Sequence, residues 1–377
     1  MNVGCVKEIK QYEFRVGMTP DNVKAYKARG HRVYIESAAG RGSMFADEDY
    51  RAAGAEILPD AESVWDCADM IVKVKEPLET EYALIRENQI IYAYLHLAAN
   101  RPLTEALLNN KSRAVGYETV RGRTGDLPLL KPMSEVAGRL SVQEGAKCLE
   151  NPMGGMGLLL GGVPGVRRAN VVIIGGGVVG TNACKMAVGL GANVTILDNS
   201  LNRLAYLDDI FGQSVTTLYS TEAAVERELR AADLVIGAVL IPGAATPKLI
   251  KHDYLKLMKP GSVIVDVAVD QGGCCETTKP TYHDKPTFII DGVVHYCVAN
   301  MPGAVAQTST LSLTNATIAY GLKIADKGLE GACREDPGLT LGVNCYRGKL
   351  TCGEVADCFG LCYSDPSDLM RSGDGDT

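Results

Sequence analysis

The segment Gly175-Gly176-Gly177-Val178-Val179-Gly180 constrains the fold of this chain most strongly, because its glycines follow a Gly-x-Gly-x-x-Gly pattern. An apolar, β-branched run over residues 170–174 precedes it, and a helical pattern to about residue 190 follows. In such a strand–turn–helix unit, Gly175 permits the tight turn, Gly177 lets the backbone approach a pyrophosphate, and Gly180 lets the helix pack on the sheet. The pattern predicts a dinucleotide-binding unit; the alternative is a glycine-rich turn without a ligand.

The next predicted strand, residues 193–197, ends at Asp198. A carboxylate there accepts hydrogen bonds from both hydroxyls of an adenosine ribose and repels a 2′-phosphate. We therefore expect NAD rather than NADP, with its pyrophosphate on the positive N-terminus of the helix after the glycine turn. Arg203 nearby counts against this preference, and a solvated acid at a strand end is the alternative interpretation of Asp198.

The rest of the 377 residues repeats the alternation of apolar strands and helical patterns, which is typical of α/β folds. Long helical segments at residues 134–149 and 310–327 bracket the second series of strands, and residues 328–377 read as short helices and loops. We predict two doubly wound, Rossmann-like domains with parallel sheets, joined by long helices. Residues 1–130 plus 307–377 would form a discontinuous substrate (catalytic) domain, and residues 131–306 the NAD-binding domain. The expected strands are residues 2–6, 32–36, 70–75, 90–95, 170–174, 193–197, 234–238, 262–267 and 288–290.

The charge and hydropathy of the chain argue against several partners. A formal net charge of -7, without a basic run, disfavours a nucleic-acid partner. No apolar stretch reaches the ~18 residues of a membrane helix, and early charges in the N-terminal segment disfavour a secretory signal. We expect a cytoplasmic protein without a membrane partner.

The chain has twelve cysteines, none in a Cys-x-x-Cys pair, so no metal site is predicted. Most are expected to be thiols packed as small apolar groups. The only cluster that merits a test for a metal or a disulfide is Cys352, Cys358 and Cys362.

Polar residues near the ends of predicted strands are the candidates for chemistry, because ligands of open α/β sheets bind outside the carboxyl ends of the strands. Lys75 could hold a carboxylate or polarise a carbonyl oxygen, and His96 could act as a general acid–base. Arg15, after the first strand, could grip a substrate carboxylate through two parallel hydrogen bonds. The alternatives are an exposed lysine, a packed histidine and a surface arginine. Asp266 and Asp270 both stand near a strand end, and spacing alone does not choose between them.

The sequence resembles the alanine dehydrogenases and the related NAD-binding subunit of proton-pumping transhydrogenase. The resemblance covers nearly the whole chain, including residues 344–361 of the tail apart from their extra cysteines. The segments that carry it are residues 7–20, 74–77, 94–98, 131–138, 266–273 and 295–305.

This resemblance implies the reversible, NAD-dependent oxidation of L-alanine to pyruvate and ammonium. It implies that Arg15 holds the substrate carboxylate and that Lys75 contacts the carboxylate or the developing carbonyl oxygen. His96 would be the general acid–base, and Asp270, rather than Asp266, a second proton-handling residue. Family members are commonly homohexamers, so a homohexamer is expected here too.

The resemblance also implies a set of cofactor-binding residues in addition to the glycines of the turn. Arg203 and Lys279 exchange arginine and lysine relative to common family patterns, and the two donors are not equivalent. The cofactor-binding residues predicted by resemblance are Ser134, Asp198, Arg203, Ser220, Val239, Leu240, Val267, Ala268, Val269, Asp270, Lys279, Val298, Ala299, Asn300 and Met301.

Three other functions remain as alternatives. The first is a transhydrogenase NAD-binding subunit, in which Arg15, Lys75, His96 and Asp270 would serve no purpose. The second is a dehydrogenase of another amino acid, such as glycine or one with a larger side chain. The third is a non-catalytic NAD sensor.

Overall fold

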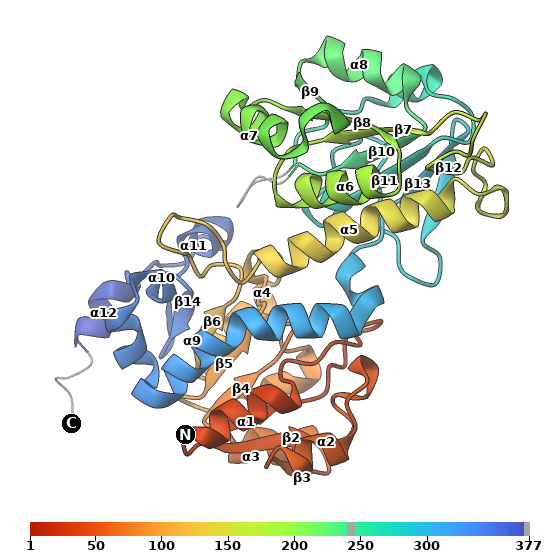
Figure 1. Ribbon diagram of the computed structural model, residues 1–377. Helices are drawn as coiled ribbons and strands as arrows, with labels where there is room; N and C mark the ends of the chain where they lie inside the picture. Colours follow the sequence, from red (N-terminus) through yellow and green to blue (C-terminus); the bar gives the residue numbers. More distant parts are fainter. Residues whose placement is uncertain (240–245, 373–377) are drawn as a thin grey trace. The chain divides into compact units, whose positions relative to one another are not determined.

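The computed structural model describes residues 1–239 and 246–372. The chain divides into two compact units (Figure 1). The terminal unit comprises Met1–Met133 and the chain from Val305 onward, and the central unit is Ser134–Ala304.

The terminal unit is built on an eight-stranded sheet in the order β15-β14-β6-β5-β4-β1-β2-β3. The six strands from the N-terminal part of the chain, β1 to β6, run parallel, as predicted. The expectation of a strand-free tail was wrong, because β14 and β15 come from the tail and pair antiparallel at the β6 edge. β15 has only two residues, and the buried Asn344 interrupts the apolar pattern of β14. The strands are β1 (Asn2–Cys5), β2 (Arg32–Glu36), β3 (Glu56–Leu58), β4 (Met70–Val72), β5 (Ile90–Ala93), β6 (Arg113–Gly116), β14 (Val343–Tyr346) and β15 (Lys349–Leu350).

Helices cover both faces of this sheet. On one face, Trp65 of α3 packs in a core that also takes side chains from α4 and α11. On the other face, the Tyr92 hydroxyl of β5 donates to the Thr317 carbonyl of α9 at 3.0 Å. Helix α9 runs further than predicted, through a kink at Gly328 (φ 69°). The helices are α1 (Pro20–Ala28), α2 (Asp47–Ala52), α3 (Ala61–Cys67), α4 (Arg101–Asn109), α9 (Ala306–Glu335), α10 (Pro337–Thr340), α11 (Gly353–Phe359) and α12 (Pro366–Ser372).

The central unit has a seven-stranded sheet in the order β12-β13-β11-β10-β7-β8-β9. All neighbours run parallel except the hairpin β12–β13, whose turn residues Asp291 and Gly292 both have positive φ, as a tight hairpin requires. Helix α8 packs on one face through Val225 and Leu229. The strands and helices are β7 (Asn170–Ile174), β8 (Asn193–Asp198), β9 (Val215–Tyr219), β10 (Leu234–Gly237), β11 (Val263–Asp266), β12 (Thr287–Ile290), β13 (Val293–Tyr296), α5 (Lys131–Cys148), α6 (Val178–Gly189), α7 (Leu201–Phe211) and α8 (Glu222–Ala231).

Short 3-10 helices occupy several connections, and three of them matter for the predicted site: η3 (Leu97–Ala99), η7 (Val267–Gln271) and η8 (Met301–Val305). The others are η1 (Arg41–Ser43), η2 (Glu79–Leu84), η4 (Asn151–Met153), η5 (Gly212–Ser214) and η6 (His252–Leu257). Within the described ranges, no helix is long and apolar enough to cross a membrane.

Each sheet reverses its strand order once. In the terminal unit the chain leaves β1 toward β2 and β3, then returns to build β4, β5 and β6 on the other side of β1. In the central unit it leaves β7 toward β8 and β9, then builds β10 and β11 on the other side. Connections diverge at such a switch point and leave a crevice at the carboxyl ends of the strands, where ligands of doubly wound folds bind.

Candidate active site

Three of the four predicted substrate and catalytic residues follow strands at the switch point of the terminal unit. Arg15 lies in the connection after β1, Lys75 in the connection after β4, and His96 in the connection after β5. The strands end at Val72 and Ala93, earlier than predicted, so Lys75 and His96 stand on loops beyond them. Neighbouring parallel strands place these three connections at one edge of the sheet.

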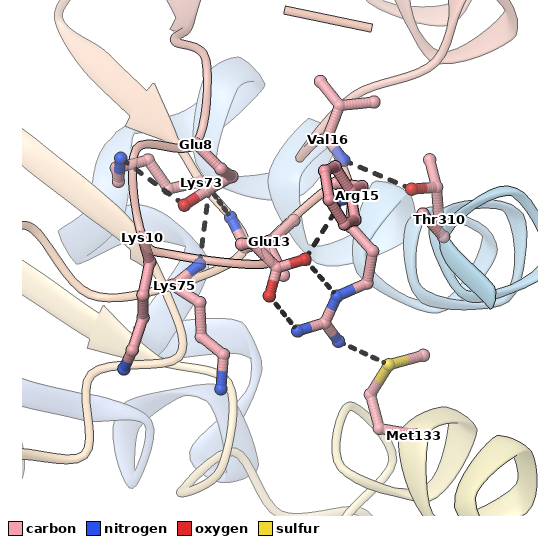
Figure 2. A network of polar contacts seen from close by, with 12 residues as sticks. Glu8, Lys10, Glu13, Arg15, Val16, Lys73, Lys75, Met133 and Thr310 are labelled. Atoms are coloured by element: carbon pink, nitrogen blue, oxygen red, sulfur yellow. Dashed lines mark hydrogen bonds and ion pairs between the residues drawn. The ribbon is translucent and has the colours of Figure 1, made fainter. Parts of the chain in front are cut away.

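Arg15 is buried, with 2% of its surface exposed, so it is not a surface charge. Its guanidinium meets Glu13 in a two-pronged pair, with Nε donating to Oε1 at 2.7 Å and Nη2 to Oε2 at 2.5 Å (Figure 2). Its Nη1 lies 3.0 Å from the sulfur of Met133. The fork fixes the plane of the guanidinium. Glu13 was not predicted from the sequence as its partner.

Lys75 is half-buried rather than exposed. Burial, together with the charges of Arg15 and Lys10, lowers the pKa of its ammonium. Figure 2 shows the ends of Lys75 and Lys10 pointing the same way, and no contact joins the Lys75 ammonium to the residues drawn. Lys10 pairs with Glu76 at 2.5 Å. The neighbouring cations Arg15, Lys10 and Lys75 together favour an anionic ligand here.

A buried triad of charges, which we call the Glu8–Lys73–Glu81 cluster, holds the loop before Lys75. The Lys73 ammonium, fully buried, lies 2.8 Å from Glu81 and 3.6 Å from Glu8. The Glu8 carboxylate accepts hydrogen bonds from the backbone N–H of Val74 at 2.6 Å and of Lys75 at 3.4 Å. Burial is the largest effect on Glu8 and raises its pKa to about 7. This cluster was not predicted from the sequence, although a lysine directly after the apolar run of β4 could have indicated it.

His96 is exposed, so it is not a packed core histidine. Its backbone is in the left-handed region, with φ 46° and ψ 41°, immediately before η3. Its ring stacks on Tyr94, with centroids 5.9 Å apart, and the Tyr94 hydroxyl donates to the Leu129 carbonyl at 2.6 Å. The imidazole is therefore open to solvent on a turn of defined geometry.

The glycine turn of the central unit follows β7 and caps α6. A Cβ on Gly175 (φ 102°) would lie 2.7 Å from the Ala238 carbonyl oxygen, and one on Gly180 would lie 1.8 Å from that of Gly175, so the fold itself requires both glycines. A Cβ on Gly177 would meet no atom of the chain within 4 Å. Packing gives no reason for glycine at this position, whereas the close approach of a pyrophosphate does. The turn therefore fits a dinucleotide.

Asp198 and Arg203 both hold the glycine turn. The Asp198 carboxylate accepts from the Gly176 N–H at 2.7 Å and from the Ser200 N–H at 2.8 Å. The Arg203 guanidinium donates to the Gly176 carbonyl and, at 2.5 Å, to the Thr181 hydroxyl. Arg203 thus braces the turn, a role that the sequence did not indicate.

The two acids near the end of β11 have different environments. Asp266 is fully buried and accepts from the backbone of Ala268 at 3.1 Å and of Cys274 at 2.9 Å, and from the Thr278 hydroxyl at 2.5 Å. Asp270, in η7, is exposed. Asp266 therefore shapes the turn that carries Asp270, and only Asp270 is open to a ligand.

The other predicted cofactor contacts follow the carboxyl ends of strands in the central unit, apart from Ser134 in α5 and Lys279 in the connection between β11 and β12. The Lys279 ammonium lies 4.5 Å from the centre of the Phe288 ring. Leu240 lies outside the described residues. Ser220 follows β9 and Val239 follows β10; Val267, Ala268, Val269 and Asp270 follow β11; and Val298, Ala299, Asn300 and Met301 follow β13.

The twelve cysteines, all of which lie in the described ranges, are free thiols. Burial raises the pKa of several of them, including Cys274 and Cys297. In those same ranges, no group of three or more histidine, cysteine or acidic side chains could hold a metal ion.

Two family models match most of the chain: "Alanine dehydrogenase/PNT, N-terminal domain" over residues 4–137 and "Alanine dehydrogenase/PNT, C-terminal domain" over residues 141–353. The alanine dehydrogenase of Methanococcus maripaludis is 56% identical over 365 residues, which are 97% of this chain and 98% of that one. That of Halomonas elongata is 53% identical over 370 residues, 98% of this chain and 100% of that one. A solved structure of an L-alanine dehydrogenase matches with a TM-score of 0.93 and 52% identity, over 96% of this chain and 99% of that one.

Proposed function

The chain belongs to the alanine dehydrogenase/PNT family, and from this we propose that it catalyses the reversible, NAD-dependent oxidative deamination of L-alanine to pyruvate and ammonium. The observation that carries the proposal is the convergence of Arg15, Lys75 and His96 beyond the carboxyl ends of β1, β4 and β5. A guanidinium, an ammonium and an imidazole are the groups that an amino-acid dehydrogenase needs around a small substrate.

Arg15 and Lys75 bind the substrate carboxylate. Glu13 offsets one of their two positive charges, which leaves a net attraction for one carboxylate. Because Glu13 also locks the guanidinium plane, Arg15 loses little conformational entropy when it binds the substrate. The substrate is held with its Cα–H bond in a fixed direction, which contributes to the rate through proximity.

The central unit binds the dinucleotide. Gly177 allows the backbone to approach the pyrophosphate, and Asp198 accepts hydrogen bonds from the ribose hydroxyls, which favours NAD over NADP. When bound, the nicotinamide supplies the hydride acceptor. Arg203 keeps the turn in the shape that the pyrophosphate needs, through its bonds to Gly176 and Thr181.

His96 moves the protons. An exposed imidazole takes a proton from the water that adds to the oxidised substrate carbon and returns it to the departing amine. Asp270 is proposed as a second acid that assists these proton transfers. A homohexameric assembly and a cytoplasmic location remain predictions.

The test is NAD⁺ reduction, followed as NADH absorbance, with each of the common L-amino acids and glycine in turn. We expect L-alanine to have the highest kcat/KM. A higher kcat/KM for glycine or a larger amino acid would contradict the choice of alanine. NADH binding without turnover of any amino acid would contradict the enzyme and favour the transhydrogenase-type subunit.

A further inference from the structure

His96 has a backbone conformation that an L-residue adopts at a cost. Its φ of 46° and ψ of 41° lie in the left-handed region, where a Cβ crowds the neighbouring carbonyl oxygen. Such residues persist only where surrounding contacts over-determine them. After His96, the backbone closes into η3 through the Ala99 N–H, which donates to the His96 carbonyl at 3.1 Å. A contact at the N-terminal side of this turn must therefore hold it.

That contact is with the carboxylate of Glu118. Its Oε1 accepts from the backbone N–H of His96 at 2.7 Å and from that of Leu95 at 3.0 Å. Glu118 stands 22 residues further along the chain, just beyond β6, the neighbour of β5 in the sheet. Within the described ranges, no lysine, arginine or histidine forms an ion pair with it. Its negative charge is thus matched by backbone N–H groups.

The segment that carries Glu118 is itself fixed. The Tyr117 N–H donates to the Ala93 carbonyl at 2.9 Å, which extends the pairing of β5 and β6. The Tyr117 ring meets Tyr94 edge to face at 5.0 Å, and Tyr94 stacks on the His96 ring. On the other side, Asn344 of β14 donates to the Thr119 hydroxyl at 3.0 Å. Tyr117 and Glu118 therefore fix the direction of the His96 ring and the shape of its backbone, respectively.

We propose that Glu118 is a positioning residue for His96, which rests on the proposed acid–base role of that histidine. The carboxylate holds two adjacent N–H groups, and these set the left-handed turn that points the imidazole outward. Without it, both N–H groups lose their partner, the turn relaxes toward ordinary backbone, and the ring moves. A displacement of about 1 Å costs on the order of 100-fold in rate.

The experiment compares Glu118→Ala and Glu118→Gln with Glu105→Gln. Glu105 is a control in the same region, because it is half exposed and forms an exposed ion pair with Arg101 on α4. We expect Glu118→Ala to lower kcat by about 100-fold, with KM for alanine and Kd for NADH changed less than about 3-fold. The kcat of Glu118→Gln should fall less, because the amide oxygen of glutamine still accepts a hydrogen bond from an N–H. Glu105→Gln should match the parent enzyme.

A second arm repeats Glu118→Ala in a His96→Ala background. If Glu118 acts through His96, the substitution Glu118→Ala does not lower the residual rate of His96→Ala any further. An equal loss in both backgrounds, or a parent-like kcat in both Glu118 variants, would overturn the positioning role. The two proposals fail differently. A parent-like kcat in the single variant His96→Ala would overturn the acid–base role and this inference with it. An inactive His96→Ala together with a parent-like kcat in Glu118→Ala would overturn only the inference.

Discussion

Charged side chains, several of them buried, form or support the predicted substrate site of the terminal unit, whereas the predicted cofactor site of the central unit is built around a glycine turn. Arg15 is 2% exposed, and Lys73 and Glu8, which hold the loop before Lys75, are 0% and 6% exposed. In the central unit, Gly175 and Gly180 are required by backbone contacts, and Asp198 and Arg203 bind the turn itself. In the terminal unit, contacts between side chains hold the charged groups in place. In the central unit, contacts of the backbone set the shape of the glycine turn. Substitutions of buried charges in the terminal unit should therefore change its unfolding free energy, and substitutions in the glycine turn should change Kd for NADH.

The largest effect is expected from the Glu8–Lys73–Glu81 cluster. Lys73→Met leaves two buried carboxylates without their cation, which costs about 3–5 kcal/mol of unfolding free energy. Trp65, the single tryptophan, is buried in the terminal unit, so its fluorescence during urea unfolding reports on this unit. The control is Lys24→Met, whose exposed pair with Asp21 should contribute less than about 0.5 kcal/mol. Similar losses in both variants would contradict the importance of the buried charge.

The corresponding change in the central unit is Gly180→Ala. Its Cβ would lie 1.8 Å from the Gly175 carbonyl oxygen, so the turn must open. We expect Kd for NADH to rise by about 100-fold, a loss of about 2.7 kcal/mol, with the Trp65 transition unchanged. Gly189→Ala is the control in the same helix, because a Cβ there meets no atom within 4 Å. It should leave Kd unchanged; equal effects of the two variants would contradict a specific role of the turn.

A smaller effect is expected in the pH dependence of the terminal unit. Burial raises the pKa of Glu8 from its ordinary 4.5 to about 7, so the folded state holds a proton that the unfolded state has lost between these values. The resulting stability is fully present below pH 4.5 and is lost as pH rises through about 7, with a slope of at most about 1.4 kcal/mol per pH unit. Glu8→Gln removes this dependence and should gain stability relative to the parent as pH rises from 5 to 8. A constant difference in unfolding free energy across that range would show that Glu8 titrates normally.

The smallest effect is expected from Lys10→Met. Burial lowers the pKa of Lys75, and the charges of Arg15 and Lys10 lower it further. Removing Lys10 also leaves Glu76 without its partner, so Lys75 stays protonated to higher pH. We expect KM for alanine at pH 9 to fall by less than about threefold, and less at high salt. A higher KM at pH 9 would instead place Lys10 in direct contact with the substrate.

The features that sequence predicted are those whose cause is local. Gly175, Gly177 and Gly180 lie within one turn, and Asp198 ends the next strand. The doubly wound fold follows from the same alternation of strands and helices, although both sheets also contain antiparallel strands at an edge. Lys75 and His96 could be proposed as site residues because each follows an apolar strand.

The features that sequence did not predict depend on pairs that are distant along the chain. Glu8 holds the N–H of Val74, 66 residues away, and Glu118 holds that of His96, 22 residues away. No periodicity specifies which carboxylate meets which backbone group, because the sheet order decides it. The left-handed backbone of His96 could not be predicted for the same reason, because the carboxylate that holds it, Glu118, follows the neighbouring strand β6.

We propose that the terminal unit carries His96, the main acid–base of an alanine dehydrogenase, and that the central unit carries the cofactor and the second acid, Asp270. The most direct test measures two quantities on one preparation of His96→Ala: kcat with L-alanine and NAD⁺, and Kd for NADH by fluorescence titration. We predict that kcat falls by at least about 100-fold while Kd for NADH stays within about twofold of the parent. Retained turnover, or a loss of NADH binding equal to the loss of rate, would contradict the claim.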